Sequence, residues 1–169
     1  MITITCTEQR LKEKISLLLD GVSEPLYRGL SEQAQRDYQR EGVLLPYDGA
    51  LAVGKGVCFS SDLEKALSYR KGKLIVTSRE KLDPKRQAVD TRQAGYDQRA
   101  EQRLRQRKES FTAYELWDEV LQDDIITRIM PGAPDYVFVK RTPVTQDEII
   151  AEIDITTEEV QDHDNERRN

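Results

Sequence analysis

The sequence predicts an α+β fold, and three observations lead to this class. Short β-branched apolar runs occur beside segments in which apolar residues recur at helical spacing, so the chain contains both strands and helices. The two kinds of segment follow one another irregularly, whereas a doubly wound parallel sheet would need regular alternation. The length of 169 residues suits one domain with a buried core. We therefore expect a single α+β domain.

The first third of the chain predicts two strands and two helices. Residues 2–4 are typical of a short strand, and apolar residues at helical spacing over 11–19 predict the helix that follows. A second strand is expected at 26–28. Ser31 is a suitable N-cap for a second helix, and the Gly- and Pro-rich stretch 42–56 predicts a loop of the kind that carries ligands.

The remaining elements are read from the same two periodicities. In order, we expect a strand at 57–59, a helix at 63–69, a strand at 73–77, a loop at 84–91, two helices across 94–122 divided near Ser110, and strands at 125–129 and 136–140. The last strand is expected within 148–155, where Ile153 and Ile155 fall on one face. Beyond Thr157 the polar sequence predicts a frayed tail.

Composition excludes several classes of protein. Charged residues make up 34% and hydrophobic residues 37%, with a mean hydropathy of -0.69, and no run approaches the roughly 20 apolar residues of a membrane span. The N-terminus lacks the features of a signal peptide, so we expect a cytoplasmic protein. Cys6, Cys58 and His163 are the only cysteines and histidine, which cannot supply a zinc site, so no metal is expected.

The net charge of -5 hides an uneven distribution. Residues 79–108 carry ten Lys and Arg against five Asp and Glu, so this segment is +5 and the remainder of the chain is -10. Its most concentrated part is 103–108. Such a segment can contact nucleic-acid phosphates, contact an acidic protein, or form a solvated helix face.

Three polar motifs stand beside predicted strands. Arg28 ends an apolar run and is followed by Gly29, a pattern that suits an arginine holding a phosphate, because guanidinium donors match phosphate oxygens. The run 60–62 (Ser-Ser-Asp) lies between a strand and a helix, and 146–148 (Gln-Asp-Glu) precedes the last strand. Each also has an ordinary structural interpretation, as a surface arginine, a helix N-cap and a polar turn.

Together the three motifs resemble those of the ADP-ribosyltransferase family. The resemblance is to the class with an arginine on the first core strand, a Ser-x-Ser motif on a strand entering a helix, and a late Glu/Gln-x-Glu turn. Here these are 27–29 (Tyr-Arg-Gly), 59–62 (Phe-Ser-Ser-Asp) and 146–148 (Gln-Asp-Glu), and Asp62 replaces the second serine. The resemblance implies two packed, mostly antiparallel sheets that form an NAD cleft, with helices from the N-terminal half along one side.

The same resemblance implies an NAD-dependent mono-ADP-ribosyltransferase, a glycosyltransferase that uses NAD as substrate and needs no metal. NAD would be bound by the residues of the first two motifs, namely Tyr27, Arg28, Gly29, Ser60 and Ser61, with Arg28 on the phosphates. Glu148 would stabilise the oxocarbenium-like transition state, and Gln146 would address the acceptor from the same side of an extended segment. A protein acceptor is favoured over nucleic acid, contacted through 79–108.

Two alternatives stay open. The first alternative is a non-catalytic nucleic-acid or protein-binding module of α+β fold. The second is an enzyme of the same fold that only hydrolyses NAD. We expect one domain over 1–157, in which 79–122 forms a basic, helical, insertion-like segment, and a polar tail over 158–169. A toxin-like effector delivered into a host cell, a phage-encoded modifier of host proteins and a bacterial defence component all fit the resemblance.

Overall fold

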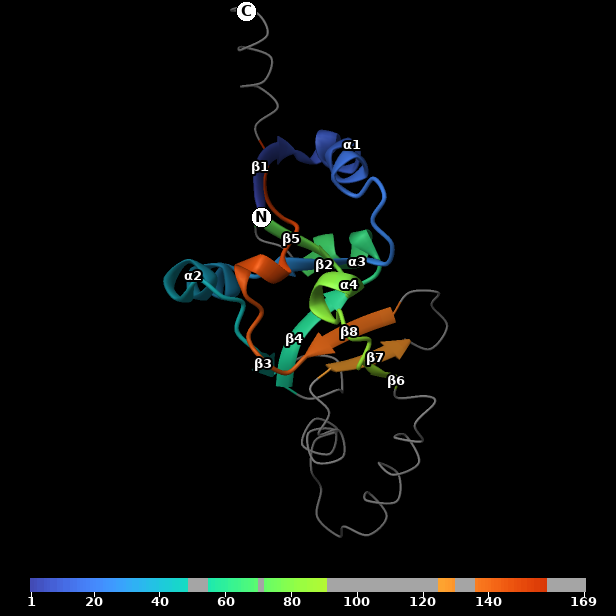
Figure 1. The fold of residues 1–169 in the computed structure, drawn as a ribbon. Helices are drawn as coiled ribbons and strands as arrows, with labels where there is room; N and C mark the ends of the chain where they lie inside the picture. Colours follow the sequence, from blue (N-terminus) through green and yellow to red (C-terminus); the bar gives the residue numbers. More distant parts are fainter. Residues whose placement is uncertain (49–54, 70–71, 91–124, 130–135, 158–169) are drawn as a thin grey trace, which may run out of the picture.

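The structure, a computed structural model, describes residues 1–48, 55–69, 72–90, 125–129 and 136–157. Within these ranges the chain forms, in order, β1 (Ile2–Thr7), α1 (Glu8–Leu18), β2 (Pro25–Leu30), α2 (Glu32–Glu41), β3 (Tyr47–Asp48), β4 (Lys55–Ser60), α3 (Leu63–Tyr69), β5 (Lys73–Ser78), α4 (Arg79–Leu82), β6 (Val89–Asp90), β7 (Ile125–Ile129), β8 (Tyr136–Lys140), the short 3-10 helix η1 (Gln146–Glu148) and β9 (Ala151–Thr156). The predicted α+β class is confirmed (Figure 1).

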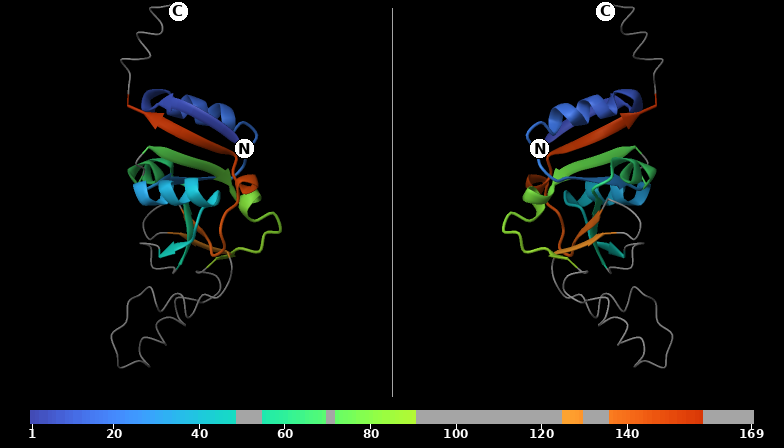
Figure 2. Two further views of the ribbon diagram at one scale, coloured as in Figure 1. Left: turned by 90° about the vertical axis from the view of Figure 1, so that its left-hand side faces the viewer. Right: turned by 90° about the vertical axis from the view of Figure 1, so that its right-hand side faces the viewer.

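The described strands join into one sheet in the order β1-β9-β5-β2-β4-β8-β7-β6, with β3 paired to β4. The β1–β9 and β6–β7 pairs are parallel, and the other pairs are antiparallel. Most described strand pairs are therefore antiparallel, as expected. β1 and β9 lie side by side although they come from opposite ends of the sequence (Figure 2).

The sheet changes direction sharply between β2 and β4. These two strands share a single pair, Tyr27 with Ser60, whereas β2 and β5 pair over their whole length. Figure 1 shows β4 running steeply across the direction of β2 and β5. The described strands thus form one connected, strongly bent sheet, and the division into two packed sheets stays a prediction.

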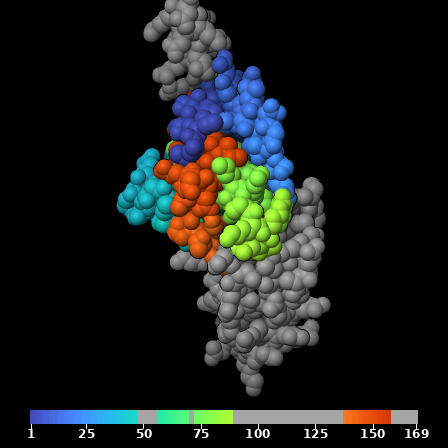
Figure 3. Space-filling model, viewed as in Figure 1, coloured from blue at the N-terminus to red at the C-terminus, as the bar shows by residue number. Residues whose placement is uncertain are grey.

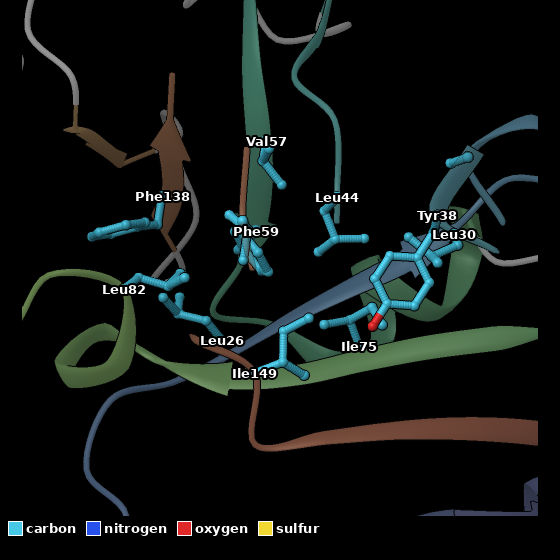
Figure 4. Close-up of a cluster of buried hydrophobic side chains, with 12 residues drawn as sticks. Leu26, Leu30, Tyr38, Leu44, Val57, Phe59, Ile75, Leu82, Phe138 and Ile149 are labelled. Carbon is cyan, nitrogen blue, oxygen red and sulfur yellow. The ribbon is translucent and has the colours of Figure 1, made fainter. Parts of the chain in front are cut away.

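Two apolar clusters cover opposite faces of β2. Leu26 and Leu30 belong to the first cluster, which fills the inside of the bend together with Phe59 and Phe138 (Figure 4). Tyr27 belongs to the second cluster, with side chains from α1, α3, β5 and β9. This alternation is the period-2 pattern of a strand that is covered on both sides.

Helices lie on both faces of the sheet, which corrects the expectation that they follow one side. Ala34 and Tyr38 of α2 and Leu82 of α4 pack into the first cluster, whereas Leu11 of α1 and Ala66 of α3 pack into the second. The physical reason is that β2 and β5 carry buried apolar side chains on both faces, and each face must be shielded from water.

The caps explain why α2 begins and ends where the sequence predicts. The Ser31 hydroxyl accepts a hydrogen bond from the Ala34 amide at 3.2 Å, which satisfies one of the free donors of the first turn. Gly42 follows the helix with φ of 72°, the left-handed conformation that favours glycine. Leu44 then bridges to Val144 and directs the chain toward β3.

Four short elements were not expected. β3 lies in the predicted loop 42–56, β6 lies in the predicted loop 84–91, and α4 directly follows β5 because the Ser78 hydroxyl caps it. η1 replaces the extended turn expected at 146–148. The predicted helices across 94–122, most of the basic segment and the tail at 158–169 lie outside the described residues.

Candidate functional site

Arg28 projects from β2 into the face that holds the first apolar cluster, since it lies between Leu26 and Leu30 on the strand. Its Nη1 donates a hydrogen bond to the carbonyl oxygen of Cys58 at 2.9 Å. Its Nε is buried and has no hydrogen-bond partner. Burial lowers the pKa of the guanidinium, which nevertheless stays charged at neutral pH. The residue is therefore a half-buried cation whose buried Nε has spare donor capacity.

No carboxylate of the described residues forms an ion pair with Arg28. Burial lowers the pKa of its guanidinium, and Cys58 of β4 and Tyr47 of β3 act in the opposite direction. Unpaired buried charges are costly in a protein interior. An arginine that keeps unused donors in such a place is a candidate ligand for an anion.

Asp37 is the carboxylate of α2 that faces this region, and it is already satisfied. Its side chain accepts hydrogen bonds from the Tyr47 hydroxyl, from Gln33 Nε2 at 2.9 Å and from Arg40 Nη2 at 3.1 Å. The Tyr47 hydrogen bond is the largest of the effects that lower the pKa of Asp37. Burial, followed by the bond to Asp37, raises the pKa of Tyr47 to about 12. Tyr47 thus binds Asp37, and among the described residues no carboxylate pairs with Arg28.

The Cys58 thiol is affected by two guanidinium groups, those of Arg28 and Arg141. Burial raises the pKa of the Cys58 thiol, and the positive charges of Arg28 and Arg141 act in the opposite direction. Arg141 directly follows β8, which pairs with β4 through Cys58 and Val139. The end of β8 therefore brings positive charge to the same strand that receives the Arg28 hydrogen bond.

Tyr27 and Ser60 lie on the other side of β2 from Arg28. Tyr27 is directly opposite Ser60 in the antiparallel pair, and paired residues project to the same face. Tyr27 is part of the second cluster, and burial raises the pKa of its hydroxyl. Gly29 pairs with Leu74 of β5. The residues of the first motif therefore do not all face one site, as the alternation of a strand requires.

The 60–62 motif forms the turn that starts α3. The Ser60 hydroxyl accepts the amide of Asp62 at 3.0 Å, and Asp62 Oδ1 accepts the amide of Glu64 at 3.1 Å. Ser61 lies between them at a bend and is partly buried. These contacts are those of an N-cap, the structural interpretation of the motif.

Glu148 ends η1, and its carboxylate is held at both oxygens. Oε1 accepts the Thr145 amide at 3.2 Å within a capping box, and Oε2 accepts Lys140 Nζ. The side chains of Lys140 and Glu148 are 16% and 18% exposed, so the pair is mostly shielded from water. The backbone oxygen of Glu148 accepts the Thr77 hydroxyl at 2.5 Å, which ties η1 to β5.

The helical conformation of η1 overturns one expectation. Gln146 and Glu148 were expected on the same side of an extended segment, but a 3-10 helix has about three residues per turn, so residues two apart point in different directions. Gln146 is exposed. Burial, followed by Glu152, raises the pKa of Tyr38 in α2, and a hydrogen bond with the Gln146 side chain acts in the opposite direction. The Tyr38 hydroxyl donates to the sulfur of Met1 at 3.7 Å.

Arg28 and Glu148 belong to the same side of the bent sheet. Leu26 and Leu30 flank Arg28, Ile149 follows Glu148, and all three pack into the first cluster (Figure 4). Figure 3 shows the segments of η1 and α4 side by side on this face, and the Thr77 contact fixes that arrangement. The structure thus places the segments of the first and third motifs on the same side of the sheet, whereas Ser60 lies on the other side of β2 from Arg28.

Four polar residues of this region were missed by the sequence analysis, namely Asp37, Tyr47, Lys140 and Glu152. Lys140 ends a strand, and a lysine at such a position usually has an exposed side chain. Glu152 lies on the face of β9 opposite Ile153, a pattern that indicates an exposed position, yet it is only 8% exposed. The cause is the cover of this face by α2, which alternation along a single strand does not reveal.

The described part of the basic segment contributes two of its arginines to ion pairs within the chain. Arg79 and Arg86 contact Glu24 at 3.5 Å and 3.2 Å. Such partly exposed pairs contribute little stability, about 0–1 kcal/mol. The concentrated run at 103–108 lies outside the described residues.

Within the described ranges, no group of three or more His, Cys, Asp or Glu side chains is arranged to hold a metal ion. None of the described helices has the length and apolar character to cross a membrane. Comparison of the chain with protein-family models, with curated proteins and with solved structures gave no match.

Proposed function

We propose that this protein transfers ADP-ribose from NAD to a macromolecular acceptor, with a protein as the favoured acceptor. The observation that carries the proposal is the guanidinium of Arg28, buried at Nε without a hydrogen-bond partner and facing the same apolar cluster as the segment of Glu148. A pyrophosphate offers the oxygens that would use such spare donors. The mostly antiparallel pairing of the described strands also supports the proposal, while the two packed sheets that the resemblance implies stay a prediction.

The chemistry requires a carboxylate near the ribose. Cleavage of the bond between ribose and nicotinamide develops positive charge on the ribose, and an ionised glutamate that binds its hydroxyls stabilises that charge. Arg28 would bind the phosphates, Glu148 would act on the ribose, and Gln146, which is exposed, would contact the acceptor. Tyr27 and Ser60 face the other side of β2 from Arg28, so with Gly29 and Ser61 they would support the NAD site indirectly, through the positions of β2 and the start of α3.

A binding module without catalysis is the second candidate, and the contacts of Glu148 favour it. The carboxylate already serves a capping box and an ion pair with Lys140, which are structural tasks. In this case Arg28 would bind a phosphate of a nucleic acid or of a modified protein. If the basic segment 79–108 also contacts phosphates, affinity would fall steeply with salt.

The Glu148→Gln variant separates the two candidates. Glutamine is also a suitable capping-box residue and keeps a side-chain oxygen, but it removes the charge that matters in the transition state. We expect NAD binding to change little and nicotinamide release to fall by about a hundred-fold or more. The measurement is incubation with labelled NAD and a cell lysate, following nicotinamide release and labelled acceptor together.

Asp147→Asn is the matched control, because it removes one charge from the same short helix at an exposed position. Its activity is expected to equal that of the unmodified protein. Full activity of Glu148→Gln would contradict the proposed transfer. Release of nicotinamide without any labelled acceptor would instead identify an NAD hydrolase.

A further inference from the structure

Lys140 makes a contact that no sequence motif indicated. It ends β8, where Val57 of β4 pairs with it, and its ammonium group reaches Oε2 of Glu148 across the loop that joins β8 to η1. The side chains of both residues are less than one fifth exposed, at 16% and 18%. The pair is therefore more rigid than an exposed pair, whose long side chains move freely in water.

The two oxygens of the Glu148 carboxylate are held from different sides. Oε1 accepts the amide of Thr145 at 3.2 Å, and the Thr145 hydroxyl lies 3.1 Å from the same oxygen but only 2.5 Å from Asp147 Oδ1. A hydroxyl has one proton to donate, so the Asp147 contact takes it. Oε1 then has one firm donor from the backbone, and Oε2 has Lys140.

This arrangement leaves acceptor capacity for a ligand. A carboxylate has about four acceptor sites, so one donor on each oxygen leaves a site on each for hydroxyl groups. Two attachment points also fix the plane of the carboxylate, whereas Thr145 alone would allow it to rotate. Catalytic groups contribute most when their geometry is fixed before the substrate binds.

We propose that Lys140 is the positioning residue of Glu148, which it holds in the orientation needed to bind the ribose hydroxyls in the transition state. The inference rests on the proposed transfer of ADP-ribose. Lys140 itself touches neither the ribose nor the leaving nicotinamide. Its effect is expected in the catalytic step, because a carboxylate that rotates still leaves the phosphate contacts of Arg28 intact.

The variants for the test are Lys140→Met, Lys140→Arg and Lys73→Met. Methionine keeps most of the apolar stem and removes the charge, while arginine keeps a cationic donor. Lys73→Met is the matched control, since Lys73 also lies on a strand of this sheet, is 10% exposed in its side chain, and pairs with Asp154 at 3.2 Å. It therefore loses an ion pair of the same sheet that includes neither Lys140 nor Glu148, although its carboxylate partner is more exposed, at 42%.

In kinetics of nicotinamide release, we expect Lys140→Met to lower kcat by about ten- to a hundred-fold and to change KM for NAD less than about threefold. Lys140→Arg should restore most of kcat, and Lys73→Met should keep it. A loss of kcat that Lys140→Arg does not restore, or one that Lys73→Met shares, would indicate a general structural effect and overturn the inference.

The amide resonance of Thr145 gives a second readout that needs no activity. Because this amide donates to Glu148 Oε1, its proton shift reports whether the carboxylate stays in place. We expect Lys140→Met to move the resonance toward its position in Glu148→Ala, and Lys140→Arg and Lys73→Met to leave it unmoved. An unmoved resonance in Lys140→Met would overturn the positioning role.

The outcomes separate the inference from the proposed function. If the unmodified protein releases no nicotinamide, or Glu148→Gln releases it at full rate, the proposed function is wrong and the role of Lys140 in it is wrong too. If release depends on Glu148 but Lys140→Met retains full kcat, the inference about Lys140 alone is overturned.

Discussion

Arg28 occupies a position that a residue selected only for stability would not need. Its Nε is buried without a partner, and no described carboxylate balances its charge. An unsatisfied buried donor costs about 1–3 kcal/mol, so stability alone does not explain this position of the Arg28 side chain. The alternating apolar positions around it, Leu26 and Leu30, show that a hydrophobic side chain would fit the pattern.

We therefore predict that Arg28→Met leaves the free energy of unfolding unchanged or raises it by about 1 kcal/mol. Methionine fills a similar volume and removes the unsatisfied donor, while the carbonyl of Cys58 loses one hydrogen bond. Urea denaturation measures the stability, and calorimetry with NAD measures binding, which should be lost. A destabilisation above about 2 kcal/mol would show that Arg28 is structural.

At the scale of elements, a carboxylate of α2 forms a hydrogen bond with β3. Asp37 lies on the inner side of the helix and accepts the hydroxyl of Tyr47, while Gln33 and Arg40 hold it from its own helix. A two-residue strand has too few ladder hydrogen bonds to define its position alone. The contact between Asp37 and Tyr47 therefore places β3 beside Arg28.

The folded-state pKa of Asp37 is lowered from its ordinary value of 3.8, so Asp37 stabilises the fold above that value and loses the effect as pH falls through the lower folded pKa. We predict that Asp37→Asn is less stable than the unmodified protein at pH 7 and that the difference shrinks below about pH 4. Denaturant titrations at several pH values measure this. Glu32→Gln, an exposed charge change on the same helix, should show no such pH dependence.

In the whole molecule, the first apolar cluster joins the two directions of the bent sheet. Direct pairing between β2 and β4 amounts to Tyr27 with Ser60, but the cluster combines Leu26 and Ile75 from one direction with Phe59 and Phe138 from the other. Side-chain packing rather than strand pairing thus holds the bend, and with it the relative placement of Arg28 and Glu148.

We predict that Phe59→Ala destabilises the protein by about 3–5 kcal/mol and lowers amide exchange protection in β5 as well as in β8. The reason is that the Phe59 side chain belongs to the cluster that joins β2 and β5 to β4 and β8. Ile153→Ala, which belongs to the second cluster, should cost about 2–5 kcal/mol. Unchanged protection of β5 in Phe59→Ala would show that the two directions unfold independently.

Local chemistry made most of the regular structure predictable. The strands at 26–28, 57–59, 73–77 and 136–140, and the helix that starts after Ser31, are present because β-branched runs, helical spacing and caps act over a few residues. The elements that were missed, α4, β3, β6 and η1, are short, so few positions carry their signal. Their placement depends on contacts with distant segments, such as Thr77 with Glu148.

The candidate site was predictable only in part, for the same reason. The sequence by itself determined the α+β class, the caps of α2 and the chemical suitability of Arg28 for an anion, since these follow from residue type and near neighbours. The tertiary structure decided which side chains share a face, that Ser60 lies away from Arg28, and that Lys140 holds Glu148. Those facts depend on the bend and on helices that cover both faces of the sheet, and such contacts form between residues that are far apart in the chain.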